Sequence, residues 1–92
     1  MSEERRSSVQ MARPAERRLT RLPEKIATAV LEFILGPLLE NPQRVGAPLR
    51  GELEGLHAAR VGAYRVGYEI DERQRVITIL DVDHRADVYR PR

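Results

Sequence analysis

Two stretches decide the fold of this chain: Arg60-Val61-Gly62-Ala63-Tyr64-Arg65-Val66-Gly67-Tyr68 and Val76-Ile77-Thr78-Ile79-Leu80-Asp81-Val82-Asp83-His84-Arg85. Both are rich in β-branched and aromatic residues, which favour strands. The polar run between them, residues 71–75, is typical of a hairpin connection. Together with a strand over residues 56–61 and a turn at Gly62-Ala63, they predict three sequential strands.

Side chains alternate between the two faces of a strand, and this alternation divides the first stretch. One face receives the apolar and aromatic side chains Tyr64, Val66, Tyr68 and Ile70. The other face receives Arg65, Gly67 and Glu69. A guanidinium group is almost never buried without a partner, so Arg65 faces solvent, pairs with Glu69 or Asp81, or belongs to a binding site.

The first half of the chain predicts two helices. Pro14 suits a first helical turn, and apolar residues at helical spacing follow it, which predicts a helix from about 13 to 22. Pro23 ends that helix and opens a second one, whose apolar stripe is Ile26, Val30, Phe33 and Ile34. We expect Gly36-Pro37 to kink or interrupt the second helix and Asn41-Pro42 to end it.

The order of these elements predicts an α+β fold. Strands joined by short loops pair antiparallel, because a parallel pair needs a long crossover. An N-terminal helical hairpin packed on one face of a small antiparallel sheet leaves the opposite face open. We expect residues 1–7 to be a disordered lead, residues 8–11 to form a short first strand, and residues 8–92 to be a single domain.

Composition excludes several classes of chemistry. The 92 residues contain no cysteine, which rules out disulfides, thiolate nucleophiles and thiolate metal sites. Lys25 is the sole lysine among 16 basic residues, and arginine provides a planar fork suited to phosphate. There is no apolar leader or membrane-spanning stretch, so we expect a soluble cytoplasmic protein with no membrane partner.

Several polar side chains follow the strands in a pattern that places them near one open surface. These candidates are Arg60, Arg65, His84, Arg85 and Tyr89. No suitably spaced pair of carboxylates and no histidine-rich pattern accompanies them. We therefore do not expect metal-dependent hydrolysis or any cofactor at this site.

At these residues the chain resembles the RelE family of bacterial toxins, within the RelE/ParE superfamily. The resemblance covers nearly the whole chain, and its weaker, early part is Leu19-Thr20-Arg21-Leu22-Pro23 followed by the long helix and the Asn41-Pro42 turn. Its specific parts are residues 53–56, residues 60–71, and the ending Val82-Asp83-His84-Arg85-Ala86-Asp87-Val88-Tyr89-Arg90. A RelE/ParE-like fold is what this resemblance implies.

The resemblance also implies a function: a ribosome-dependent endoribonuclease, or mRNA interferase, that cuts messenger RNA in the A site and is silenced by a cognate antitoxin. In that family the 2′-hydroxyl of the RNA attacks the adjacent phosphate without a metal or a small-molecule ligand. Arg65 and Arg85 match the family's phosphate-contacting arginines, and Tyr89 matches its catalytic tyrosine. His84 is either a general acid or base, or simply the solvated end of a strand.

The chain departs from the best-known members of the family in one respect. Some of them carry lysines on the strand that precedes the Tyr-Arg strand, whereas residues 56–61 contain none. We expect His57 and Arg60, with Arg50 and Arg90, to contact RNA in their place.

Two other functions fit the same fold. One is a ParE-like inhibitor that binds DNA gyrase, and the other is a non-toxic, degenerate member that acts as a binding partner. The His84-Arg85 pair followed by Tyr89 favours the nuclease over the gyrase inhibitor, because a protein that does not cut RNA has no evident use for this cluster.

Overall fold

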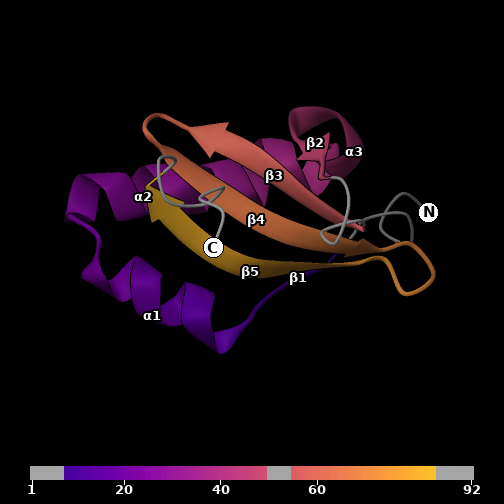
Figure 1. Ribbon diagram of the computed structural model, residues 1–92, viewed down its shortest axis with the longest axis horizontal. Coiled ribbons are helices and arrows are strands. Elements are labelled where there is room, and N and C mark those ends of the chain that lie inside the picture. Colours follow the sequence, from indigo (N-terminus) through magenta and orange to yellow (C-terminus); the bar gives the residue numbers. More distant parts are fainter. Residues whose placement is uncertain (1–7, 50–54, 85–92) are drawn as a thin grey trace.

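The computed structural model describes residues 8–49 and 55–84. Its elements in chain order are β1 (Ser8–Met11), α1 (Arg13–Arg21), α2 (Glu24–Phe33), a π-helical segment (Ile34–Leu38), α3 (Pro42–Val45), β2 (Ala47–Pro48), β3 (Leu56–Val61), β4 (Tyr64–Asp71) and β5 (Val76–His84). Figure 1 shows α2 lying behind a twisted sheet and α1 running along the edge of that sheet beside β5. The predicted helical hairpin and the three sequential strands are confirmed.

The described strands form one sheet in the order β1-β5-β4-β3-β2. The pairs β2–β3, β3–β4 and β4–β5 are antiparallel, as predicted. The pair β1–β5 is parallel, with Ser8 beside Val76 and Met11 beside Ile79. The long connection between these two strands contains both helices and leaves ample chain for a parallel return. The sheet is therefore mixed rather than purely antiparallel.

Prolines determine where the helices begin and where one of them changes its pitch. Pro14 lies in the first turn of α1, and Pro23 is the N-cap of α2. Pro37 lies inside the π-helical segment. Because proline has no backbone N–H to donate, the regular α-helical hydrogen bond is missing there and the turn is wider. The helix is thus not interrupted at Gly36-Pro37, since residues 39–40 are again α-helical; it changes its pitch there. Residues 43–49 contain the end of α3 and all of β2.

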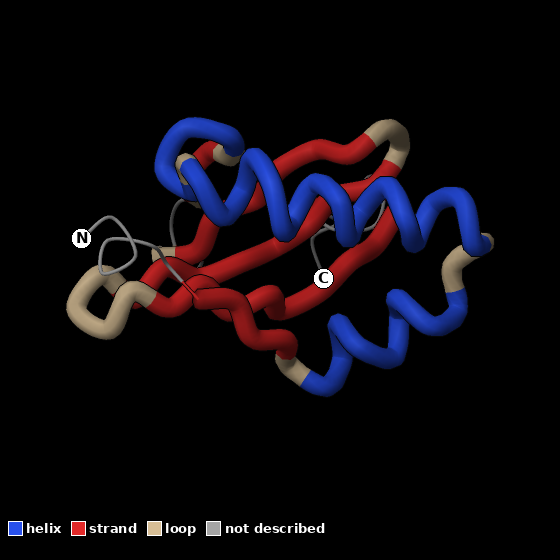
Figure 2. The backbone as a smooth tube through the Cα atoms, turned by 180° about the vertical axis from the view of Figure 1, so that it is seen from behind, coloured by secondary structure: helices blue, strands red, loops and turns tan. Residues whose placement is uncertain are grey.

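The core lies between the helices and one face of the sheet (Figure 2). It is built from apolar side chains of every layer: Ala15, Val30, Ile34, Leu38, Ala59, Val66, Tyr68, Ile77, Ile79 and Val82. No charged residue is buried among the described residues. α1 and α2 thus turn their apolar residues toward the sheet, and no helix of the described residues lies on its opposite face.

Tyr68 occupies the centre of this core with no solvent exposure. Its hydroxyl donates a 2.6 Å hydrogen bond to the carbonyl oxygen of Pro42, which ties β4 to the start of α3. Burial raises the pKa of Tyr68 to about 12, so its phenol stays protonated at neutral pH. Gly46 passes close by, where a Cβ atom would lie 2.7 Å from the carbonyl oxygen of Ala58. The chain needs glycine there to pass this close to β3.

Among the described residues, no helix combines the length and the apolar character needed to cross a bilayer.

Candidate functional site

A β-bulge in β5 decides which side chains reach the open face of the sheet. Gly67 pairs with Asp81 and Tyr68 pairs with Ile79, so Leu80 is an additional residue in β5. Beyond this point the alternation of β5 is reversed. Val82 therefore joins the core beside Val66, and Asp83 comes to lie on the open face.

Arg60, Arg65 and Asp83 form a row across three strands of the open face. Arg60 pairs with Arg65 between β3 and β4, and Arg65 pairs with Asp83 between β4 and β5. Directly opposed residues have Cβ atoms about 5 Å apart, and like charges at such positions destabilise a sheet. Two opposed guanidinium groups are an unfavourable choice for folding alone. They form a geometry that a phosphate can bridge.

Asp83 links this row to the helical hairpin. Its carboxylate forms an ion pair with Arg18 of α1, and the distance between Arg18 Nη1 and Asp83 Oδ2 is 2.6 Å. The side chain of Asp83 is 20% exposed, so solvent screens this pair only in part. The ion pair holds α1 against the end of β5 and places one negative charge next to Arg65.

His84 lies on the other side of β5 from Arg65, contrary to the shared surface expected from the sequence. It pairs with Tyr64, and the two rings meet edge to face with centroids 5.5 Å apart. The cause is alternation in β5, since Asp83 faces Arg65 and the next residue must point the opposite way. Because His84 is exposed at the end of the strand, its expected role in proton transfer stays a prediction.

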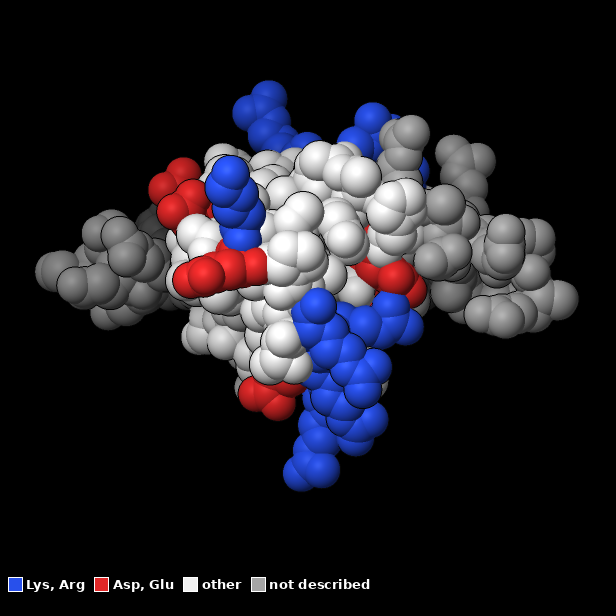
Figure 3. Space-filling view, turned by 90° about the vertical axis from the view of Figure 1, so that its left-hand side faces the viewer, with Lys and Arg blue, Asp and Glu red and all other residues white. Residues whose placement is uncertain are grey.

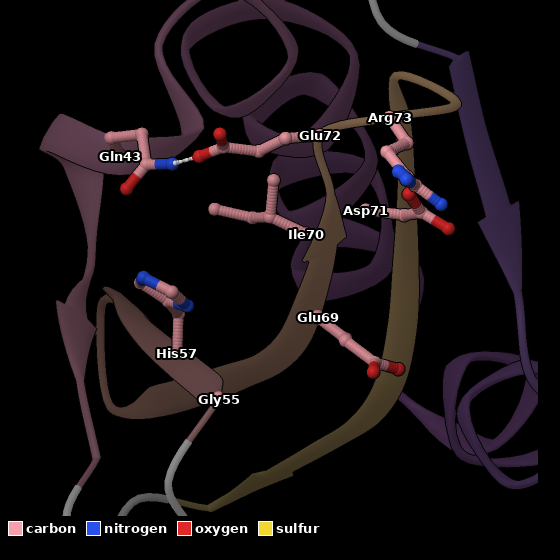
Figure 4. Close-up of a pocket in the computed structure, with 8 residues that line it drawn as sticks. All are labelled: Gln43, Gly55, His57, Glu69, Ile70, Asp71, Glu72 and Arg73. Atoms are coloured by element: carbon pink, nitrogen blue, oxygen red, sulfur yellow. Dashed lines mark hydrogen bonds between the residues drawn. The ribbon is translucent and has the colours of Figure 1, made fainter.

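His57 also lies apart from Arg60, on the side of the sheet that the helices cover. Its ring stacks on Tyr68 with centroids 5.4 Å apart, and its Nδ1 atom is buried without a hydrogen-bond partner. It lines a pocket of about 510 Å³, into which His57 and Ile70 point in Figure 4. At the rim of this pocket Gln43 donates a hydrogen bond to Glu72.

The charges around that pocket do not suit RNA. Glu69, Asp71 and Glu72 line it against a single arginine, Arg73. Carboxylates repel phosphate, so the structure does not bring His57 to a basic surface as the sequence prediction required. A nucleic-acid contact by His57 is not supported by its surroundings.

The remaining predicted site residues, Arg50, Arg85, Tyr89 and Arg90, lie outside the described residues. Sequence reasoning did not identify Asp83 and Arg18 as neighbours of the site. A signal was present in the spacing of the apolar residues of β5, since Ile77 and Ile79 are two apart and Val82 follows after three. A change from two to three within a strand is what a bulge produces.

A helical hairpin on one face of a small sheet, with opposed arginines on the other, agrees with one class of protein: small bacterial toxins. A family model described as "ParE toxin of type II toxin-antitoxin system, parDE" matches residues 9–89. The chain belongs to this RelE/ParE family of toxins from type II toxin–antitoxin systems.

Two curated relatives from Mycobacterium tuberculosis match over most of their length. Toxin RelE is 50% identical over 90 residues, which cover 98% of this chain and 93% of the relative. Toxin RelG is 49% identical over 83 residues, which cover 90% and 95%. The resemblance to RelE seen in the sequence is thereby confirmed.

Solved structures agree with this assignment. The crystal structure of the M. tuberculosis toxin–antitoxin complex RelBE2 matches with a TM-score of 0.83 at 46% identity, over 86% of this chain and 98% of that one. The archaeal RelE–RelB complex from Pyrococcus horikoshii matches with a TM-score of 0.70 at 27% identity, over 89% and 98%. The RelE/ParE fold predicted from the sequence is therefore confirmed.

Proposed function

We propose that this toxin is a ribosome-dependent endoribonuclease that cuts messenger RNA in the A site. The observation that carries the proposal is the opposed pair Arg60 and Arg65 on the face of the sheet that the described helices do not cover. Two guanidinium groups side by side on adjacent strands can contact the oxygens of one phosphodiester, which is the anion that RNA provides. The similarity to toxins named RelE supports the same activity.

The reaction needs three kinds of group. The 2′-oxygen attacks the adjacent phosphorus and gives its proton to a base, while the bond to the 5′-oxygen breaks and that oxygen takes a proton from an acid. The products are a 2′,3′-cyclic phosphate and a 5′-hydroxyl. Cationic groups stabilise the charge that develops on the phosphoryl oxygens. No step requires a metal ion.

We assign these roles to residues as follows. Arg65 and Arg85 hold the phosphate, and Tyr89 is the base, provided that neighbouring guanidinium groups favour its phenolate. His84 is a candidate for the second proton transfer, because an imidazole can both donate and accept a proton, although it points to the other side of β5 from Arg65. Arg60 extends the phosphate contact across β3, and Arg50 and Arg90 are further RNA contacts of this proposal.

The proposed partners are a cognate antitoxin, the ribosome and its messenger RNA, all met in the cytoplasm. Both solved relatives described above are complexes with an antitoxin, which supports an antitoxin partner here. An acidic or amphipathic antitoxin segment that folds on binding suits a toxin with a basic face.

The test uses ribosomes programmed with a defined A-site codon. Wild-type toxin is expected to cut the message, and Arg65→Ala and Arg85→Ala are expected to slow the cut by about 10²- to 10³-fold, the usual cost of losing one group that stabilises a developing oxyanion. Arg73→Ala, on the exposed turn after β4, is the matched control and should cut at the wild-type rate. Equal cutting by wild type and Arg65→Ala removes Arg65 from the mechanism, and no cutting by any of them overturns the function.

Inhibition of DNA gyrase is the second candidate, because the matching family model is described as a ParE toxin. A supercoiling assay with purified gyrase separates the two activities. A degenerate, non-toxic member would fail both assays, and expression without antitoxin would not arrest growth.

A further inference from the structure

The outer surface of α1 carries a concentration of positive charge that the proposed site does not use. The nine residues Arg13–Arg21 contain four arginines and one glutamate, while the whole chain has a net charge of only +2. Arg13, Arg17 and Arg21 are all exposed, and we name these three the arginine ridge. In Figure 3 basic side chains gather along the lower edge of the molecule, where α1 lies.

The ridge points directly away from the core. With about 100° per residue, Arg13, Arg17 and Arg21 span roughly 80° of the helix circumference. The side chains that α1 turns inward are Ala15, Leu19 and, just after the helix, Leu22. The centres of the two sets are about 170° apart. The arginines thus contribute nothing to the packing of α1 on the core and are accessible to a partner outside the domain.

Arg18 fixes the position of this ridge. It lies between the ridge and the sheet, and its ion pair with Asp83 holds α1 to the end of β5, next to the row that contains Arg65. The helix is held at both its apolar face and its edge. A charged surface held in this way keeps a constant position relative to the open face of the sheet.

The chemistry of the ridge selects a phosphate backbone over other partners. The segment RPAERRLTR contains no aromatic residue on which an unpaired base could stack. A protein interface has an apolar centre, and on α1 the apolar residues are turned inward. The ridge is about 12 Å long, a length over which duplex DNA presents about seven phosphates.

We propose that the arginine ridge binds the phosphate backbone of double-helical RNA, at a site separate from the strand that is cut. The inference rests on the proposed function, because a ribosome-dependent nuclease must be held against the structured RNA that surrounds its substrate. The open face of the sheet then engages the message, and α1 engages a duplex beside it.

The test compares two triple variants that lose the same charge. The ridge variant is Arg13→Gln, Arg17→Gln and Arg21→Gln; the control is Lys25→Gln, Arg44→Gln and Arg73→Gln, all of which are exposed. Binding of the full-length proteins to an RNA duplex of about 20 base pairs is measured by fluorescence anisotropy at several salt concentrations. Thermal melting establishes that both variants fold.

Three phosphate contacts contribute a slope of about −2.7 to the dependence of log K on log salt. Between about 50 and 200 mM salt, wild type is therefore expected to lose about 40-fold more affinity than the ridge variant. The control is expected to keep the wild-type slope. An unchanged slope in the ridge variant, an equal loss in the control, or a ridge variant that loses only antitoxin binding would each overturn the inference.

Programmed ribosomes distinguish this inference from the proposed function. The ridge variant should need a higher toxin concentration for half-maximal cutting and should reach the wild-type rate at saturation. If wild type cuts and the ridge variant matches it at every concentration, the ridge inference fails alone. If wild type does not cut at all, the proposed function fails, and the duplex measurement, which needs no ribosome, still decides whether the ridge binds RNA.

Discussion

Replacing Tyr68 by Phe changes both the stability of this protein and the way that stability depends on pH. The Tyr68 hydroxyl is fully buried and donates its hydrogen bond to the Pro42 carbonyl oxygen. Tyr68→Phe keeps the ring and its stacking on His57 but leaves that carbonyl without its donor. The expected loss at pH 8 is about 1–3 kcal/mol of unfolding free energy.

The sign of the pH effect follows from the raised pKa. The pKa of Tyr68 is about 12 in the folded protein and about 10 in an unfolded chain, so above pH 10 the unfolded state releases this proton first. The stabilisation is complete below pH 10 and is lost as the pH rises toward 12. Linkage gives a loss of about 1.4 kcal/mol at pH 11.

Urea unfolding at pH 8, 10 and 11 measures both effects. All other residues are the same in the two proteins, so the difference between wild type and Tyr68→Phe isolates Tyr68. That difference should shrink by about 1.4 kcal/mol between pH 8 and pH 11. If the unfolding free energies of the two proteins keep a constant difference from pH 8 to pH 11, the assignment of a buried, protonated phenol at the centre of the core is refuted.

Two further changes test the packing and the charge arrangement. Gly46→Ala forces a Cβ atom against the carbonyl oxygen of Ala58 and is expected to lower the unfolding free energy by about 1–3 kcal/mol, measured by thermal melting. The control Gly36→Ala meets nothing within 4 Å and should be neutral or stabilising. Equal melting temperatures of the two variants would contradict this. Asp83→Asn removes the ion pair with Arg18 at a cost below about 1 kcal/mol, and it is expected to strengthen binding of a single-stranded RNA several-fold because a negative charge next to Arg65 is lost. Unchanged or weaker RNA binding by Asp83→Asn would show that Asp83 does not oppose the phosphate.

The main elements of the fold could be predicted from the sequence because their signals are local. The apolar stripe of α2, the prolines at positions 14, 23 and 37, and the β-branched runs of β4 and β5 each specify an element within a few residues. The parallel pairing of β1 was not predicted, because the pattern in residues 8–11 carries no information on which strand they join.

The placement of side chains within the site was harder to predict, because it depends on how strands pair and not on local signals alone. Arg60 and Arg65 flank a tight turn, so strict alternation correctly puts them side by side. The additional residue Leu80 reverses that alternation farther along β5 and exchanges the faces of Asp83 and His84. The stacking of His57 on Tyr68 depends on a contact between strands, which the alternation along one strand does not specify.

The parallel pairing of β1 with β5 has a consequence for synthesis. Ser8 pairs with Val76, and β5 contributes Ile77, Ile79 and Val82 to the core, so the last described strand lies between the first strand and β4. Until β5 emerges from the ribosome, β1 lacks its neighbour and the helices lack part of the surface that they cover. This part of the core therefore forms only after β5 has been synthesised, because contacts between distant segments need both of them.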